Sequence, residues 1–205
     1  MRKRTGGMLL GSLLLAAVPG GLSAQLYWDS PPLINPNGPN GMSVFVGDFA
    51  PGSDNLGGMA RWQQGPTGYR VGLGEEAGTG DVAVFGGIDV NGVLADNLGG
   101  EAMDVLWWGG AGVGIGSDFV ASFPLGLAIG WFGTEGKTAF SPYAGGHLAL
   151  DIGTGAYDGA DLSATFDLGL DLTTASGWMI RFNASFAGVD ERRALAVGFH
   201  VPSGS

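Results

Sequence analysis

Long parts of the chain alternate between apolar and small polar residues. The segment DLSATFDLGLDLTT, residues 161–174, places Leu, Ala or Phe at every even position up to Leu172 and mostly Asp, Ser or Thr at the odd positions. Alternation with a period of two indicates a β-strand whose two faces meet different surroundings. The pattern therefore predicts β-structure and raises the question of which face meets water.

Runs of strand length recur from Met42 onward, and turn residues separate them. Connectors such as PGSDNLGG, TGAYDGA and TASG are rich in Gly, Asp and Ser, and no stretch combines a sustained helical period with helix caps. A turn is predicted at Asn91-Gly92, after the fourth run. The ten predicted runs are 42–50, 58–64, 67–74, 81–90, 104–116, 119–133, 138–152, 161–173, 178–188 and 193–201.

The first 24 residues predict a secretory signal peptide. Basic residues at positions 2–4 precede an apolar stretch at 8–18, and LSA at 22–24 resembles a small-residue cleavage site. The apolar stretch is well short of the roughly 20 residues of a membrane-spanning helix. We therefore expect a signal peptide at 1–24, a Pro/Asn/Gly-rich N-terminal arm at 25–41, a barrel domain at 42–202 and a tail at 203–205.

Composition narrows the function classes. The 205 residues include 41 Gly, only 14% are charged, and the mean hydropathy is +0.22. The formal net charge is −10, and three of the nine basic residues lie in the predicted signal peptide. This acidic balance argues against nucleic acid as a partner. The chain has no Cys, so disulfides and a lipoprotein-type signal are excluded.

The polar face of the runs consists of Gly, Ala, Ser and Asp with an occasional Arg or His. A soluble sandwich normally exposes many long Lys, Glu and Gln side chains, whereas Lys137 is the only Lys after position 4. Small residues suit the narrow lumen of a barrel, and large aliphatic and aromatic residues suit lipid. We therefore predict that Leu162 to Leu172 face lipid and that Asp167 and Asp171 face the lumen.

The predicted fold is all-β, an antiparallel up-and-down transmembrane β-barrel of eight to ten strands with ten favoured. A bacterial single-chain barrel has an even number of strands, and lipid does not tolerate an open sheet edge. Aromatic residues near strand ends predict interfacial girdles. The members of these girdles are Trp107, Trp131, Phe132, Trp178, Tyr143 and Phe199.

Eight polar residues share the inferred inward parity. They predict either a structural network of paired charges or a polar lumen that binds or passes small cations. We expect no cofactor, because GAGVGIG at 110–116 lacks the dinucleotide-loop spacing, and no metal, because no ligand spacing is present. The lumen-facing candidates are Arg70, Asp89, Asp104, His147, Asp151, Asp167, Asp171 and Arg181.

Several segments carry a resemblance to a known family. They are YRVGLG, FGGIDV, AGVGIG, LGLAIGWFG, YAGGHLALDIG and FDLGLDL, together with the signal peptide and an aliphatic-aromatic last strand. With these features the chain resembles the small bacterial outer-membrane β-barrels of the OmpX and OmpA-barrel type. Such barrels usually end on an aromatic residue, whereas here HVPSGS follows Phe199.

The resemblance implies a location in the cell outer membrane of a Gram-negative bacterium, outer-membrane lipid as surroundings, and barrel assembly machinery as a partner during insertion. It favours a structural or surface-interaction role, with an extracellular partner bound through loops near 157–158 and 190–193. We expect no enzyme, because only His147 and His200 are available as bases. The alternatives are a narrow, porin-like, cation-preferring pore, an outer-membrane lipid-modifying enzyme and a soluble secreted β-sandwich binding protein.

Overall fold

The computed structural model describes residues 40–48, 56–75, 81–98, 103–131, 139–154, 159–187 and 192–203. The predicted signal peptide and almost all of the N-terminal arm lie outside these ranges. So do Phe132, the loop positions 157–158 and 190–191, and the last two residues of the tail. No helix among the described residues is long and apolar enough to cross a membrane.

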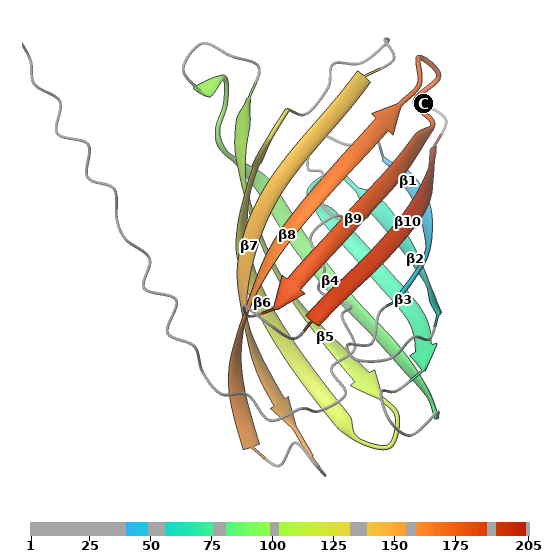
Figure 1. Cartoon of the computed structure of the whole chain (residues 1–205), viewed down its shortest axis with the longest axis vertical. Helices are drawn as coiled ribbons and strands as arrows, with labels where there is room; N and C mark the ends of the chain where they lie inside the picture. Colours follow the sequence, from blue (N-terminus) through green and yellow to red (C-terminus); the bar gives the residue numbers. More distant parts are fainter. Residues whose placement is uncertain are drawn as a thin grey trace, which may run out of the picture.

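Ten antiparallel strands form one closed barrel, with each strand hydrogen-bonded to its neighbours in sequence and β1 paired with β10. The strands run obliquely to the long axis of the barrel (Figure 1). The strands are β1 (Gly41–Gly47), β2 (Gly57–Gln64), β3 (Thr67–Glu75), β4 (Val82–Ala95), β5 (Asp104–Ile115), β6 (Phe119–Gly130), β7 (Ala139–Gly153), β8 (Gly159–Thr173), β9 (Met179–Ala187) and β10 (Arg192–Pro202).

The prediction of an all-β antiparallel barrel with ten strands is confirmed, and most strand bounds agree within two residues. The predicted turn at Asn91-Gly92 is wrong, because β4 continues through it to Ala95. The backbone N–H of Asn91 donates to the Pro66 carbonyl at 2.9 Å, and its side-chain amide donates to Asp89 at 3.2 Å. These two contacts hold residues of high turn propensity in an extended strand.

The two faces of the wall differ sharply in exposure. Leu162 is 56% exposed and Leu125 is 65% exposed, whereas Asp167 and Asp171 are fully buried inside the barrel. The large aliphatic and aromatic residues thus point outward, and the small polar residues point into the lumen. This burial is the reverse of a soluble protein, where charged groups face out.

Four large aromatic side chains point inward, and each lies beside a glycine of the neighbouring strand. Phe45 pairs with Gly198, Phe85 with Gly72, Trp108 with Gly126 and Tyr143 with Gly169. A Cβ atom built on any of these glycines would overlap the aromatic ring of its partner. The glycines therefore make room for rings that fill the lumen. The expectation that Tyr143 belongs to an interfacial girdle is wrong, because it is only 6% exposed.

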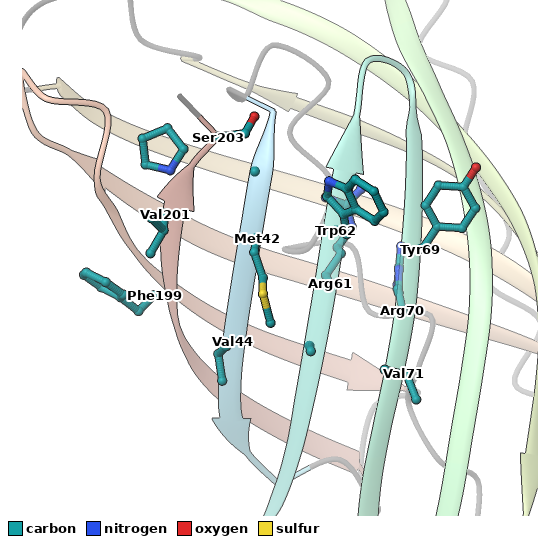
Figure 2. A pocket seen from close by; sticks show the side chains of 13 residues that line it. Met42, Val44, Arg61, Trp62, Tyr69, Arg70, Val71, Phe199, Val201 and Ser203 are labelled. Carbon is teal, nitrogen blue, oxygen red and sulfur yellow. The ribbon is translucent and has the colours of Figure 1, made fainter. Parts of the chain in front are cut away.

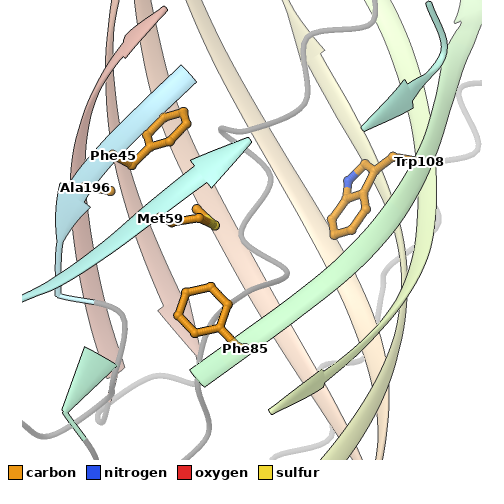
Figure 3. Close-up of a cluster of buried hydrophobic side chains, with 5 residues drawn as sticks. All are labelled: Phe45, Met59, Phe85, Trp108 and Ala196. Atoms are coloured by element: carbon orange, nitrogen blue, oxygen red, sulfur yellow. The ribbon is translucent and has the colours of Figure 1, made fainter. Parts of the chain in front are cut away.

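The rings contribute to a buried apolar cluster that joins opposite sides of the barrel. Phe45, Met59, Phe85, Trp108 and Ala196 come from β1, β2, β4, β5 and β10, and their side chains point into the lumen (Figure 3). A second cluster contains Leu106, Ala128 and Tyr143. Both clusters occupy interior volume that a wide water-filled pore would leave open.

The exposed tryptophans of the described wall gather at one end of the barrel. This terminal end is where β1 begins and β10 ends, next to the turn at residues 65–66. Exposed Tyr69 belongs to the same belt. The exposed tryptophans are Trp62, Trp107, Trp131 and Trp178. Trp and Tyr are enriched at the interface between membrane and water, and a belt of this kind is typical of one edge of a membrane barrel.

We predict that Gly169→Ala destabilises the barrel by about 1–3 kcal/mol, because the added methyl group must displace the buried Tyr143 ring. The measurement is equilibrium urea unfolding of the protein refolded into lipid vesicles. Gly146→Ala is the matched control on the neighbouring strand, where the nearest atom to a new Cβ is a carbonyl oxygen at 3.4 Å. Equal stability of the two variants would contradict the packing of Tyr143 on Gly169.

Candidate functional site: the polar lumen

The lumen holds the buried charged residues of the described chain, and most of them form three clusters that each join two or three strands. Seven of the candidates predicted from parity are 5% exposed or less; six of them belong to these clusters, and Asp151 lies apart from them. The clusters are centred on Asp89, Asp171 and Asp167.

Asp89 on β4 binds two arginines. Arg61 Nη2 on β2 lies 2.9 Å from Asp89 Oδ1, and Arg70 Nε on β3 lies 2.9 Å from Asp89 Oδ2. All three side chains are at most 2% exposed. Arg61 and Arg70 are opposite each other in the register of β2 and β3, so one carboxylate bridges two cations that would otherwise repel.

Asp171 on β8 forms a two-pronged pair with Arg181 on β9. Arg181 Nε donates to Oδ1 at 2.9 Å and Nη2 donates to Oδ2 at 3.0 Å. The two residues are direct register partners. A guanidinium group that presents two parallel N–H groups to one carboxylate fixes both distance and orientation.

Asp167 on β8 accepts hydrogen bonds from strands on both of its sides. His147 Nδ1 on β7 donates to Oδ2 at 3.1 Å, and Ser185 Oγ on β9 donates to Oδ1 at 2.5 Å. Asn183 lies beside the network, with its Oδ1 3.3 Å from Ser185 Oγ, and its Nδ2 donates to the Leu168 carbonyl at 3.1 Å. This cluster connects three consecutive strands through one fully buried carboxylate.

The two remaining candidates lie apart from these clusters. Asp151 on β7 is buried and accepts a hydrogen bond from Ser163 Oγ on β8 at 3.3 Å. Asp104 begins β5 at the terminal end, is only half-buried, and accepts from the Asn97 backbone N–H at 3.1 Å. The structure therefore brings six of the eight candidates into clusters and leaves two near the ends of strands.

Arg61 is not among the eight residues predicted to face the lumen. The alternation along its strand does indicate an inward position, because Arg61 directly precedes the outward Trp62. Parity reasoning also missed the contact between Ser43 on β1 and His200 on β10, where Ser43 Oγ lies 2.8 Å from His200 Nδ1. These strands are first and last in the sequence, so only the closure register places the two residues opposite each other. No local pattern contains that information.

The lumen offers limited chemistry. Ser43 and His200 form a nucleophile–base contact of suitable distance, and His200 Nε2 has no hydrogen-bond partner among the described residues. Both side chains are buried, at 2% and 3% exposure. Ser185 has the wrong partner for activation, because it donates to Asp167 and not to His147. No group of three His, Asp or Glu residues in the described ranges could hold a metal ion.

Together these observations define a closed ten-stranded antiparallel barrel with an apolar exterior and a paired polar interior, of the outer-membrane type. No protein-family model matches the chain, and no curated protein is significantly similar to it. A solved structure, the crystal structure of the outer membrane enzyme PagL, is similar to it at 13% identity with a TM-score of 0.38. The alignment covers 79% of this chain and 99% of that chain.

This comparison corrects one prediction. The expectation that the chain is not an enzyme is contradicted by the similar structure, which is that of an outer membrane enzyme. The expectation rested on the scarcity of histidines, and a count of bases does not exclude activity in a barrel of this kind. At such low identity and TM-score the likeness assigns no activity or catalytic residue to this chain.

We predict that Asp89→Asn lowers the free energy of unfolding by about 3–5 kcal/mol, because it removes the charged carboxylate that the buried guanidinium groups of Arg61 and Arg70 both bind. Asp161→Asn is the control, since Asp161 is an exposed residue of β8. Urea titration in lipid vesicles, followed by tryptophan fluorescence, measures both. A loss below about 1 kcal/mol for Asp89→Asn, the range of exposed ion pairs, would contradict the buried cluster.

Proposed function

We propose that the protein is an outer-membrane β-barrel with a filled, non-conducting lumen and a structural or surface-interaction role. The observation that carries the proposal is the inverted burial of the wall. Large apolar residues are exposed all around the outside, while charged residues are buried and paired inside. Contiguous apolar surface of this extent is rare on soluble proteins and is typical of lipid-facing walls.

A cation-preferring pore fits this interior less well. Conduction through a lumen requires water beside the charges, yet the carboxylates of Asp89, Asp167 and Asp171 are buried and each is engaged by a cationic or hydrogen-bonding side chain. The aromatic cluster around Trp108 fills further space. A lumen built in this way stabilises the wall from within and favours a scaffold whose outer surfaces make the functional contacts.

The proposal also includes the relation of this protein to the known families of small outer-membrane barrels. OmpX-type and OmpA-type barrels have about eight strands, whereas this barrel has ten. We propose a related but wider small barrel that is held by outer-membrane lipid and inserted by barrel assembly machinery. An extracellular partner that binds through the loops is the surface-interaction role we favour.

Electrophoresis and bilayer recordings test this proposal together. We expect the protein in the outer-membrane fraction to resist SDS when unboiled, to change apparent mass on boiling, and to produce no discrete conductance steps in planar bilayers. The closed hydrogen-bonded wall explains the resistance to SDS and the change on boiling, and the filled lumen explains the absence of conductance. A soluble band without a heat shift would refute the membrane barrel. Steps that Asp167→Asn with Asp171→Asn abolishes would refute the filled lumen.

A second candidate function is hydrolysis of a lipid ester, and one contact favours it. Ser43 Oγ lies within hydrogen-bond reach of His200 Nδ1, which is the geometry needed for a base to activate a hydroxyl nucleophile. The pair lies on the closure seam, near the terminal end of the barrel. Substrate reaches it only from the lumen, because the wall separates it from lipid.

If the chain has esterase activity on phospholipid, we expect Ser43→Ala to reduce it at least about a hundredfold, the scale of nucleophile and general-base contributions. Release of fatty acid from phospholipid vesicles by the refolded protein measures the activity. Ser122→Ala is the control, because Ser122 is a buried lumen serine whose Oγ has no hydrogen-bond partner among the described residues. Activity that survives Ser43→Ala would eliminate this pair as the catalytic site.

A further inference from the structure

The outer face of the wall carries a hollow of about 840 Å³ over β10, β1, β2 and β3. Figure 2 shows these strands side by side, with Met42 and Val44 on β1 between Phe199 on β10 and Trp62 on β2. The volume lies within the range of about 300–1,000 Å³ that is typical of small-molecule sites. The hollow is therefore large enough for a ligand and not only a gap between two side chains.

A small residue on β2 creates the hollow. Ala60 is the register partner of both Val44 on β1 and Val71 on β3, so a methyl group lies between two branched side chains. One pair further toward the terminal end, Trp62 and Tyr69 are register partners with ring centroids 6.3 Å apart. The hollow therefore has a low floor at Ala60 and aromatic walls at the end that belongs to the tryptophan belt.

The lining presents almost no polarity to the outside. Its two charged residues, Arg61 and Arg70, direct their guanidinium groups into the lumen, where both bind Asp89. The remaining polar groups gather at the terminal end, at Ser203 and the exposed Tyr69. An occupant must therefore be apolar along its length, with any polar part at the terminal end.

The wall is also shortest at this place. β1 has seven residues and β2 has eight, fewer than the roughly 9–11 residues of a typical membrane-crossing strand. Lipid beside such a short wall must adapt its packing, at a modest cost per ångström of mismatch. A tail that lies in a concave surface gains dispersion contacts on three sides, which a flat wall does not provide.

We propose that this hollow binds one acyl chain of a phospholipid, with the headgroup beside Trp62, Tyr69 and Ser203. The ligand is a phospholipid and not the multiply phosphorylated lipid of lipopolysaccharide, because the lining offers no outward cation to phosphate groups. The inference rests on the proposed membrane location. It adds a defined lipid site to the apolar outer wall.

The test fills the floor of the hollow with Ala60→Phe. Its matched control is Ala184→Phe on β9, where the alanine also lies between two branched residues, Leu168 and Leu195, but outside the hollow. The proteins are refolded in detergent, titrated with synthetic phosphatidylethanolamine, and analysed by native mass spectrometry for retained lipid. A parallel titration uses diphosphorylated lipid A.

We expect wild type and Ala184→Phe to retain one phosphatidylethanolamine, and Ala60→Phe to bind it about tenfold more weakly. Equal retention by both variants, an equal loss in both, or preferential retention of lipid A would each overturn the proposal. Electrophoresis of each unboiled sample shows whether the variant still forms a barrel, and so distinguishes failure of the lipid site from failure of the proposed membrane barrel. A variant that shows the heat shift but unchanged lipid retention refutes only the lipid site.

Discussion

Buried charge controls the register of this barrel. Asp89, Asp167 and Asp171 each lie in the lumen against a cationic or hydrogen-bonding partner from a neighbouring strand. A slip of one residue in any of these strands would turn a carboxylate onto the apolar outer face and separate it from its partner. The cost of such a slip greatly exceeds that of an imperfect apolar contact, so the ion pairs select one alignment among many similar alternating ones.

Small residues give this wall two different properties. Inside, glycine admits Phe45, Phe85, Trp108 and Tyr143, whose rings cover the backbone of the neighbouring strand and fill the space between the charged clusters. On the outside, Ala60 carries only a methyl group between two branched side chains and leaves a hollow. The glycines beside the four rings are therefore a packing requirement of a narrow, filled barrel.

The sequence predicted the barrel, its ten strands and the inward parity of the charged residues, because a period of two survives in almost every strand. It did not predict that Asn91 stays extended, since a backbone hydrogen bond to Pro66 and a side-chain hydrogen bond to Asp89 overcome its turn propensity. It placed Tyr143 on the wrong face, because an aromatic residue near a strand end fits both a girdle and a filled lumen. Which lumen residues contact one another depends on the register between strands. No local pattern in the sequence specifies that register.

The seam between β1 and β10 has a kinetic consequence. Ser43 and His200 are 157 residues apart in sequence, yet they touch across the seam, and Ala196 and Phe45 of the two seam strands share one apolar cluster. Contacts of such high sequence separation require most of the chain to be ordered before they form. β10, the last strand of the barrel in sequence, thus closes it against the first, and until β10 pairs with β1 one edge of β1 lacks its backbone hydrogen-bond partners.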